Sequence, residues 1–413
     1  MANLSGVNIQ KGKPGANVRN ADDSISGIVI AAPEPAGLTH DVPVTVFNIN
    51  DVEALGITAE FDEQENVNAF RHLKEFYRLV GARTELHLMV VAETTTMTEI
   101  LEEGAQAEVL LVTAQGKIRQ LAVGVNPEGE IVTVDGLPQD VSDAIAEAQR
   151  LAEWAYQNHM PTQVFLEGFH FNAPAASAAD LRDIENLEAT KVTLVIGQDY
   201  QYAETKTGNA QKFADVGTVL GVCSRATVNQ NIGENESFNI TDATRNAWMV
   251  PGLSSHQKNS EVYSQLQTLE NKGYVFGVTY TGLAGVRINN DHVCAPIIVD
   301  EDNVMNEHTV AYGRVMDKAA RSLRTVYLPK VKTDWPVDEA TGKLSPGTIV
   351  ALEDIGDNVF ENMQRRGEIT SGSTTVDPES DLLVEKVLKL SYSVIPRGSI
   401  NEINGVINLK TQL

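Results

Sequence analysis

Few side chains in this sequence are spaced for catalysis. Glu167 and His170 could act as a general acid and base, but three positions apart on an extended segment their side chains point to opposite faces. The sequence has no GxxxxGKS/T phosphate-binding loop, no GxGxxG after a strand and no GxSxG nucleophile motif. These absences favour a protein that is not an enzyme.

Patterns that would bind a metal ion are also missing. No two histidines stand four positions apart, and HExxH does not occur. Asp300, Glu301 and Asp302 could hold a divalent cation, but acidic residues before a helix are more typical of a solvated turn. Cys223 lies on the apolar side of a predicted helix, which favours a place in the core over a nucleophile. We therefore predict no catalytic residue, no metal site and no cofactor.

The composition is typical of a folded protein with an acidic surface. The chain has 413 residues, of which 42% are hydrophobic and 21% charged, and its net charge of −24 would repel nucleic acid phosphates. It has no run of about 18 apolar residues that could span a membrane, and residues 1–15 lack the apolar centre of a signal peptide. Cys223 and Cys294, the only cysteines, are far apart, which favours a reducing compartment. We expect a cytoplasmic protein that binds no nucleic acid and inserts into no membrane.

The elements that would position any site form two folded parts, in a mixed α+β fold. Residues 25–295 read as a layered α/β body, because strand-like runs alternate with helical periodicity. Strands are expected at 26–32, 42–47, 86–91, 164–168, 191–197, 274–280 and 285–289. A short helix is expected between the strands at 164–168 and 191–197, and longer helices at 67–80, 141–155 and 210–223.

Two stretches of this body depart from the alternation. Residues 109–113 and 118–125 read as a β hairpin and 131–134 as a further strand, so we expect a small all-β insertion near 105–135. Residues 225–258 are polar and rich in Asn, which indicates an exposed excursion.

The second part, residues 296–398, reads as a separate α+β domain. A long helix is expected over 304–327, followed by a second helix whose apolar side comprises Leu352, Ile355, Val359 and Met363. The Ser/Thr/Gly-rich stretch 370–376 is expected to be a hinge. Residues 388–394 alternate between apolar and polar, which predicts a strand that Pro396 ends.

Both ends of the chain read as loose tethers that carry short extended runs. Residues 1–24 are an arm with the apolar Leu4, Val7 and Ile9, and residues 399–413 contain the apolar Ile403, Val406, Ile407 and Leu409. An apolar strand at a free end promotes aggregation unless another strand pairs with it. The C-terminal run either closes a sheet of its own domain or is added to the sheet of a neighbouring subunit, and two such ends favour the second interpretation.

With these features the chain resembles a contractile tail sheath protein, of the kind found in phage tails and related contractile injection systems. The resemblance rests on five stretches: a strand, short helix and glycine at 42–56, a helix, turn and strand at 66–91, the stretch 280–293, the helix at 304–327, and the ending at 392–409. It covers most of the chain in the order of elements.

The resemblance implies a structural subunit that polymerises around an inner tube and contracts to drive that tube through a target envelope. The implied partners are further copies of the chain, an inner tube protein, and baseplate and tail-terminator proteins, with assembly in the bacterial cytoplasm into a virion tail or contractile injection particle. The terminal strands would link the subunits. The helix at 348–366 would face the tube through Asp354, Asp357, Glu361, Arg365 and Arg366.

Two other functions stay open from the sequence. One is another structural tail component, such as a tube or baseplate protein, although the α/β body argues against a tube protein, which is mostly β-barrel. The other is an enzyme whose site is assembled from scattered residues, which would require a deep polar pocket.

Overall fold

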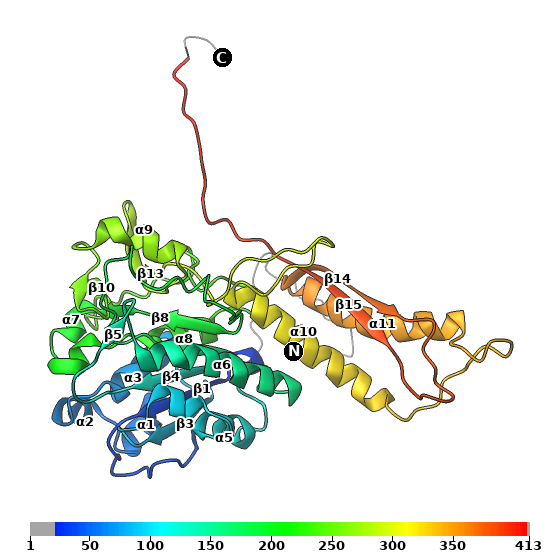
Figure 1. Cartoon of the computed structure of the whole chain (residues 1–413), viewed down its shortest axis with the longest axis horizontal. Coiled ribbons are helices and arrows are strands. Elements are labelled where there is room, and N and C mark those ends of the chain that lie inside the picture. Colours follow the sequence, from blue (N-terminus) through cyan, green and yellow to red (C-terminus); the bar gives the residue numbers. More distant parts are fainter. Residues whose placement is uncertain (1–20, 411–413) are drawn as a thin grey trace, which may run out of the picture.

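A six-stranded sheet forms the centre of the body (Figure 1). In the computed structural model, which describes residues 21–410, its strands lie in the order β2, β3, β1, β4, β7 and β8. All run parallel except β2, which pairs antiparallel with β3 at one edge. The strands are β1 (Ser26–Ala31), β2 (Val44–Val46), β3 (Leu86–Val91), β4 (Gln120–Val125), β7 (Gln163–Glu167) and β8 (Val192–Val195).

Helices cover both faces of this sheet, so every strand except β2 is buried at all its positions. Alternate side chains of β1 enter opposite cores: Val29 and Ala31 join one, and Ile28 and Ile30 join the other. The first core is closed by α4 (Met97–Leu101), α5 (Gln106–Thr113) and α6 (Gln139–Gln157). The second is closed by α1 (Ile49–Ala54), α2 (Ala59–Gln64), α3 (Ala69–Val80) and α8 (Val216–Arg225).

Short elements complete the body. One small sheet contains β9 (Gly197–Asp199), β10 (Pro251–Leu253) and β11 (Gln257–Lys258), and two hairpins contain β12 (Gly277–Tyr280) with β13 (Leu283–Ile288) and β5 (Thr133–Val134) with β6 (Leu137–Pro138). The short helices are α7 (Tyr200–Ala203), α9 (Tyr263–Asn271), and the 3-10 turns η1 (Ala21–Ser24) and η2 (Gly208–Lys212).

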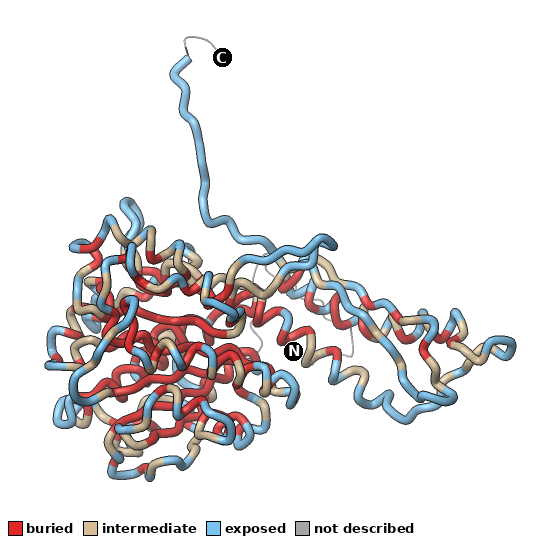
Figure 2. The backbone as a smooth tube through the Cα atoms, in the orientation of Figure 1, coloured by how far each residue is buried: buried red, intermediate tan, exposed pale blue. Residues whose placement is uncertain are grey.

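The C-terminal domain projects from the body as a narrow layer of helices on a two-stranded ribbon (Figures 1 and 2). It contains α10 (Val310–Tyr327), η3 (Leu328–Lys330), α11 (Pro346–Arg365), β14 (Ile369–Val376) and β15 (Leu390–Pro396). Its buried clusters are small compared with those of the body, and residues 397–410 then leave the domain as an exposed segment.

The mixed α/β fold class is confirmed, but the predicted all-β insertion near 105–135 is wrong. Residues 106–113 form α5, and β4 is a central strand of the main sheet, parallel to β1 and β7. A run of apolar β-branched residues does not distinguish a strand from a buried helix by period alone. Because β1 and β4 are parallel neighbours, the chain needs helical crossovers between them, and α5 is one of these.

Three smaller predictions also need correction. The excursion at 225–258 is not simply exposed: Trp248 is 1% exposed, and its Nε1 donates to Thr218 Oγ1 at 3.1 Å. No helix forms between β7 and β8. The expected hinge at 370–376 is strand β14, because its small polar residues pair along their length with β15.

The contact between α3 and α8 generates a prediction about stability. A Cβ at Gly217 in α8 would overlap the carbonyl group and Cα of His72 in α3, so Gly217→Ala must separate the two helices. We expect it to lower the free energy of unfolding by about 3 kcal/mol, measured by urea denaturation. The control is Gly347→Ala in the first turn of α11, where a Cβ meets nothing within 4 Å and higher helix propensity should add up to about 1 kcal/mol. Equal effects at the two glycines would contradict the close packing of α3 on α8.

Candidate assembly surfaces

Glu167, at the end of β7, is a structural carboxylate. Its Oε2 accepts a hydrogen bond from the backbone N of Val125 at 2.9 Å and its Oε1 from the backbone N of Ala214 at 3.0 Å. The side chain is fully buried, and His72 Nε2 lies 3.7 Å from Oε2. Because both oxygens hold backbone N–H groups, Glu167 ties two parallel strands to the segment before α8 and is not free to act as a general base.

His170 lies beyond β7 in the left-handed region, at φ 52°. Burial, together with the positive charge of Lys212, lowers the pKa of its imidazole to about 4. Its backbone N donates to the carbonyl of Lys212 at 2.8 Å. Glu167 and His170 are therefore two separate structural residues and not an acid and base pair.

The strongest buried charge network of the body centres on Arg71 in α3. Its Nη2 lies 2.6 Å from Asp215 Oδ2 and 3.2 Å from Asp199 Oδ2, and its guanidinium stacks 4.5 Å over the ring of Tyr202. The arginine is 6% exposed, so the charges are held away from water and paired with each other. This network joins α3, β9 and the start of α8, and none of its members lines the groove described below.

The other candidates for chemistry also have structural places. Cys223 is fully buried, and burial raises the pKa of its thiol. Asp300 Oδ1 accepts from the backbone N of Asp302 at 2.9 Å and of Val304 at 2.8 Å, which closes an exposed turn. Among residues 21–410, no group of His, Cys, Asp and Glu side chains is arranged to hold a metal ion. The described part of the chain also contains no helix with the length and hydropathy that crossing a bilayer requires.

The β14–β15 ribbon has two edges with different surroundings. The backbone N of Thr374 donates to Asp357 Oδ1 at 2.7 Å, and that of Val376 donates to Glu353 Oε1 at 3.0 Å. Both donors point away from β15, so two carboxylates of α11 cover this stretch of the outer edge of β14. Thr374 faces Tyr392 in the ribbon.

The outer edge of β15 is open. Tyr392 and Val394 pair with Thr374 and Gly372, so their backbone N–H groups also point away from the ribbon. Within residues 21–410, β15 pairs with no strand other than β14. Among the described residues, the outer edge of β15 is therefore unpaired.

The C-terminal arm, residues 397–410, extends from β15 away from the domain (Figures 1 and 2). Its apolar side chains are almost fully exposed: Ile403 84%, Val406 86%, Ile407 99% and Leu409 104%. The corresponding residues of the N-terminal arm, Leu4, Val7 and Ile9, lie outside the described residues. Apolar side chains with this exposure are typical of a segment that another chain covers.

The outer face of α11 carries four of the five residues predicted to face a tube. Asp354, Glu361, Arg365 and Arg366 are exposed, and Arg365 Nη2 lies 2.7 Å from Glu361 Oε2. Asp357 differs, because it is half-buried and holds β14. The prediction that these residues contact a tube stays a prediction.

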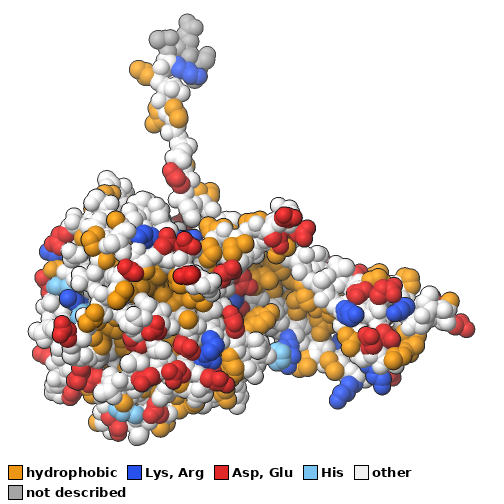
Figure 3. Space-filling view, in the orientation of Figure 1, with side chains coloured by type: hydrophobic (Ala, Val, Ile, Leu, Met, Phe, Trp, Pro, Cys, Tyr) orange, Lys and Arg blue, Asp and Glu red, His pale blue; other side chains and the backbone are white. Residues whose placement is uncertain are grey.

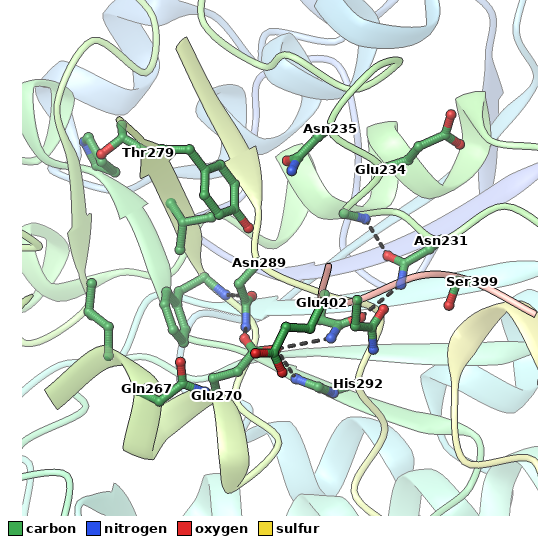
Figure 4. Close-up of a pocket in the computed structure, with 18 of the residues that line it drawn as sticks. Asn231, Glu234, Asn235, Gln267, Glu270, Thr279, Asn289, His292, Ser399 and Glu402 are labelled. Atoms are coloured by element: carbon green, nitrogen blue, oxygen red, sulfur yellow. Dashed lines mark hydrogen bonds and ion pairs between the residues drawn. The ribbon is translucent and has the colours of Figure 1, made fainter. Parts of the chain in front are cut away.

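A broad groove of about 1670 Å³ crosses the body beside the root of the arm (Figure 4). On its floor, Glu270 Oε1 accepts from His292 Nε2 and from Asn290 Nδ2, both at 2.9 Å. Burial opposes ionisation of Glu270, but the hydrogen bond from His292 holds its pKa below the usual value. Ser399 and Glu402 of the arm line one side. The polar groups on this floor are hydrogen-bonded to one another. The groove is therefore defined by its shape and not by a reactive group.

A second set of exposed apolar side chains was not predicted from the sequence. They lie at the end of the C-terminal domain distant from the body, where Figure 3 shows hydrophobic patches between charged groups. The exposed side chains are Leu328, Val331, Val350, Leu383, Val384 and Val387. These residues belong to separate segments of the chain, so only the fold shows that they share one end.

Comparisons with known proteins find matches to both parts of the chain. The family model described as DUF2586, N-terminal domain, matches residues 5–292, and the model described as DUF2586, C-terminal domain, matches residues 308–413. No curated protein matches the sequence.

Several solved structures share the fold. A chain of the anti-feeding prophage (AFP) baseplate in the contracted state is 13% identical with a TM-score of 0.57, and a chain of the AFP helical sheath in the contracted state is 13% identical with a TM-score of 0.55; each comparison covers 100% of both chains. A chain of the PVC sheath complex of an extracellular contractile injection system, also contracted, is 11% identical with a TM-score of 0.55 and covers 100% of this chain and 99% of that one. The chain therefore has the fold of contractile sheath proteins.

His170 generates a prediction about pH. A histidine whose pKa is lowered in the folded state contributes stability above its unfolded pKa of 6.5, and this contribution is lost as the pH falls toward about 4. Asn accepts a positive φ and does not titrate, so the wild type should lose about 2 kcal/mol relative to His170→Asn between about pH 7.5 and about pH 5. Urea denaturation at both pH values measures this difference.

The control is His159→Asn, which makes the same replacement at another left-handed position, exposed and at φ 64°. A stability difference between wild type and His170→Asn that does not change with pH would show that the His170 imidazole is not held neutral.

Proposed function

We propose that this chain, which belongs to the DUF2586 family over both of its domains, is the sheath subunit of a contractile injection particle. One observation carries the proposal: an arm with exposed apolar side chains and an open strand edge occur together on a chain with the sheath fold along its full length. A free strand and a free edge on the same molecule are the two halves of an interface between copies.

In this function, the arm of one copy is added to the ribbon of the next. The open edge of β15 is the acceptor, since Asp357 and Glu353 already occupy the N–H groups of β14 at Thr374 and Val376. Backbone hydrogen bonds would provide affinity, and the alternate apolar side chains of the arm would provide register. Residues 1–24 would act as the second linking arm and 399–413 as the linking strand.

The two folded parts would then have separate tasks. Residues 296–398 would form the inner assembly domain next to a tube protein, and residues 25–295 the outer body. The outer face of α11 is our candidate tube contact, through Asp354, Glu361, Arg365 and Arg366, with Asp357 holding the ribbon behind it. Contraction would be a change from an extended lattice to a shorter and wider one of lower free energy, with no nucleotide.

The particle would be assembled in the bacterial cytoplasm, as a virion tail or a contractile injection machine, with baseplate and tail-terminator proteins at its ends. A second candidate function is a baseplate component, which the similarity to a chain of the AFP baseplate favours. Images of purified protein separate the two, because a sheath forms long cogwheel-like tubes and a baseplate component does not.

Deleting Ser399–Leu413 tests the linking strand. Since residues 399–410 are exposed and contribute to no described core, the shortened protein should keep its melting temperature but remain a monomer. Size-exclusion chromatography and negative-stain images measure this, with Ser399→Ala as the full-length control. Loss of folding would show that the segment packs within its own subunit. Normal polymers would show that it does not link subunits.

Reversing two charges tests the tube contact. Asp354→Lys with Glu361→Lys should weaken co-assembly with the tube protein about tenfold without loss of stability, because both side chains are exposed. Co-sedimentation measures the bound fraction. The matched control, Glu102→Lys with Glu103→Lys, makes the same charge change on exposed residues of the body. Normal co-assembly of the α11 variant would exclude this face.

A further inference from the structure

The roots of the two arms meet at one buried lysine. Lys318 Nζ, in α10, lies 2.6 Å from Asp23 Oδ2 and 2.6 Å from Glu368 Oε1. Asp23 belongs to η1, where the N-terminal arm joins the body, and Glu368 stands immediately before β14. The three residues are 5%, 6% and 3% exposed, respectively, so the two ion pairs are shielded from water.

The N-terminal root is held from several sides. The carbonyl of Asp23 accepts from Arg314 Nη2 at 3.3 Å, and the carbonyl of Ser24 accepts from Ser224 Oγ at 2.6 Å. Arg321 Nη2 lies 3.5 Å from Asp23 Oδ1. Arg314, Lys318 and Arg321 of α10 therefore fix η1, the turn that joins the N-terminal arm to the body.

The C-terminal root is fixed on the residues that flank Glu368. Pro396, the last residue of β15, pairs with Ile369, and its carbonyl accepts from Thr370 Oγ1 at 2.9 Å. The first residue of the arm, Arg397, donates from Nη1 to the carbonyl of Gly367 at 2.9 Å. The segment 367–370 thus connects the start of the C-terminal arm to Lys318.

We propose that the triad Asp23, Lys318 and Glu368, here called the arm clamp, positions the two linking arms relative to each other. This proposal rests on the proposed function for the role of the arms, but the contacts of the triad are all made within one molecule. Lys318 is a positioning residue: among the described residues it pairs with the roots of the two arms, and it fixes the direction in which each arm leaves.

The chemistry of the clamp suits this task better than an apolar contact would. Glu368 Oε2 is buried and has no hydrogen-bond partner among the described residues, so the carboxylate depends on Lys318. Apolar side chains of similar volume often give equal stability, whereas a buried ion pair fixes one geometry and is costly to break. In a polymer, where neighbours hold both arms, displacement of one arm would be transmitted through Lys318 to the other.

Spin labels at the two roots of the full-length protein test the clamp without any polymer. Asp22→Cys and Ile395→Cys place labels on exposed positions beside Asp23 and Pro396, and the native Cys223 and Cys294 are buried. The distance distribution between the labels should be narrow in the otherwise unchanged chain. Lys318→Met, which keeps length but removes charge, should cause loss of this narrow distribution, and Lys318→Arg should restore it.

Lys191→Met is the matched control. Lys191, whose side chain is 11% exposed, also contacts two carboxylates, Asp317 of α10 and Glu307, and among the described residues it has no ion pair with either arm root. A narrow distribution in Lys318→Met, or equal broadening in Lys191→Met, would overturn the clamp. If Lys318→Met does not fold, Asp23→Asn tests the clamp by the same label distances. It removes one ion pair and leaves Lys318 paired with Glu368.

Assembly gives the second measurement. If the clamp is correct and the chain is a sheath subunit, Lys318→Met should form fewer and shorter tubes than Lys191→Met in negative-stain images. Tubes equal to those of the wild type would overturn the role of the clamp in assembly. A wild type that forms no tubes would contradict the proposed function and leave the label distances as an independent test of the clamp.

Discussion

Hydrogen bonding at the edges of the two-stranded ribbon is the constraint on which the C-terminal domain depends. A ribbon of two strands has two edges, and neither can remain unpaired without risk of uncontrolled association. Here Asp357 and Glu353 of α11 satisfy one edge at Thr374 and Val376, and the other edge stays open along β15. The contact of α11 with β14 and the proposed contact between copies both follow from this asymmetry.

The body supplies a rigid counterpart to the ribbon. Its parallel sheet is covered on both faces, and buried ion pairs around Arg71 join α3, β9 and the start of α8. The charge distribution differs between the two parts: residues 308–413 contain 13 Lys and Arg and 14 Asp and Glu, so nearly all of the net charge of −24 belongs to residues 1–307. A nearly neutral segment 308–413 can pack closely against other copies of itself, whereas the strongly acidic residues 1–307 of neighbouring copies repel one another.

The sequence was informative where one physical signal dominated. Alternation at Leu390, Tyr392 and Val394 predicted β15, and helical spacing from Leu352 to Met363 predicted α11. It failed where tertiary pairing decides: Val109 to Thr113 is apolar in either structure, and Gly372 and Ser373 look flexible until β15 pairs with them. The clamp could not be predicted, because Asp23, Lys318 and Glu368 are far apart in sequence and each is unremarkable in its own segment. The residues of the C-terminal arm were found in the sequence, since apolar residues at a free end need a partner.

The covering of β14 by two carboxylates has a consequence for the geometry of growth. A subunit with one donor strand and one acceptor edge has a valence of two along that connection, so a chain of such links elongates without branching. It is also polar, since its first member keeps an empty edge and its last member keeps an unused strand. The two ends of such a filament are chemically different, and each requires its own terminating partner.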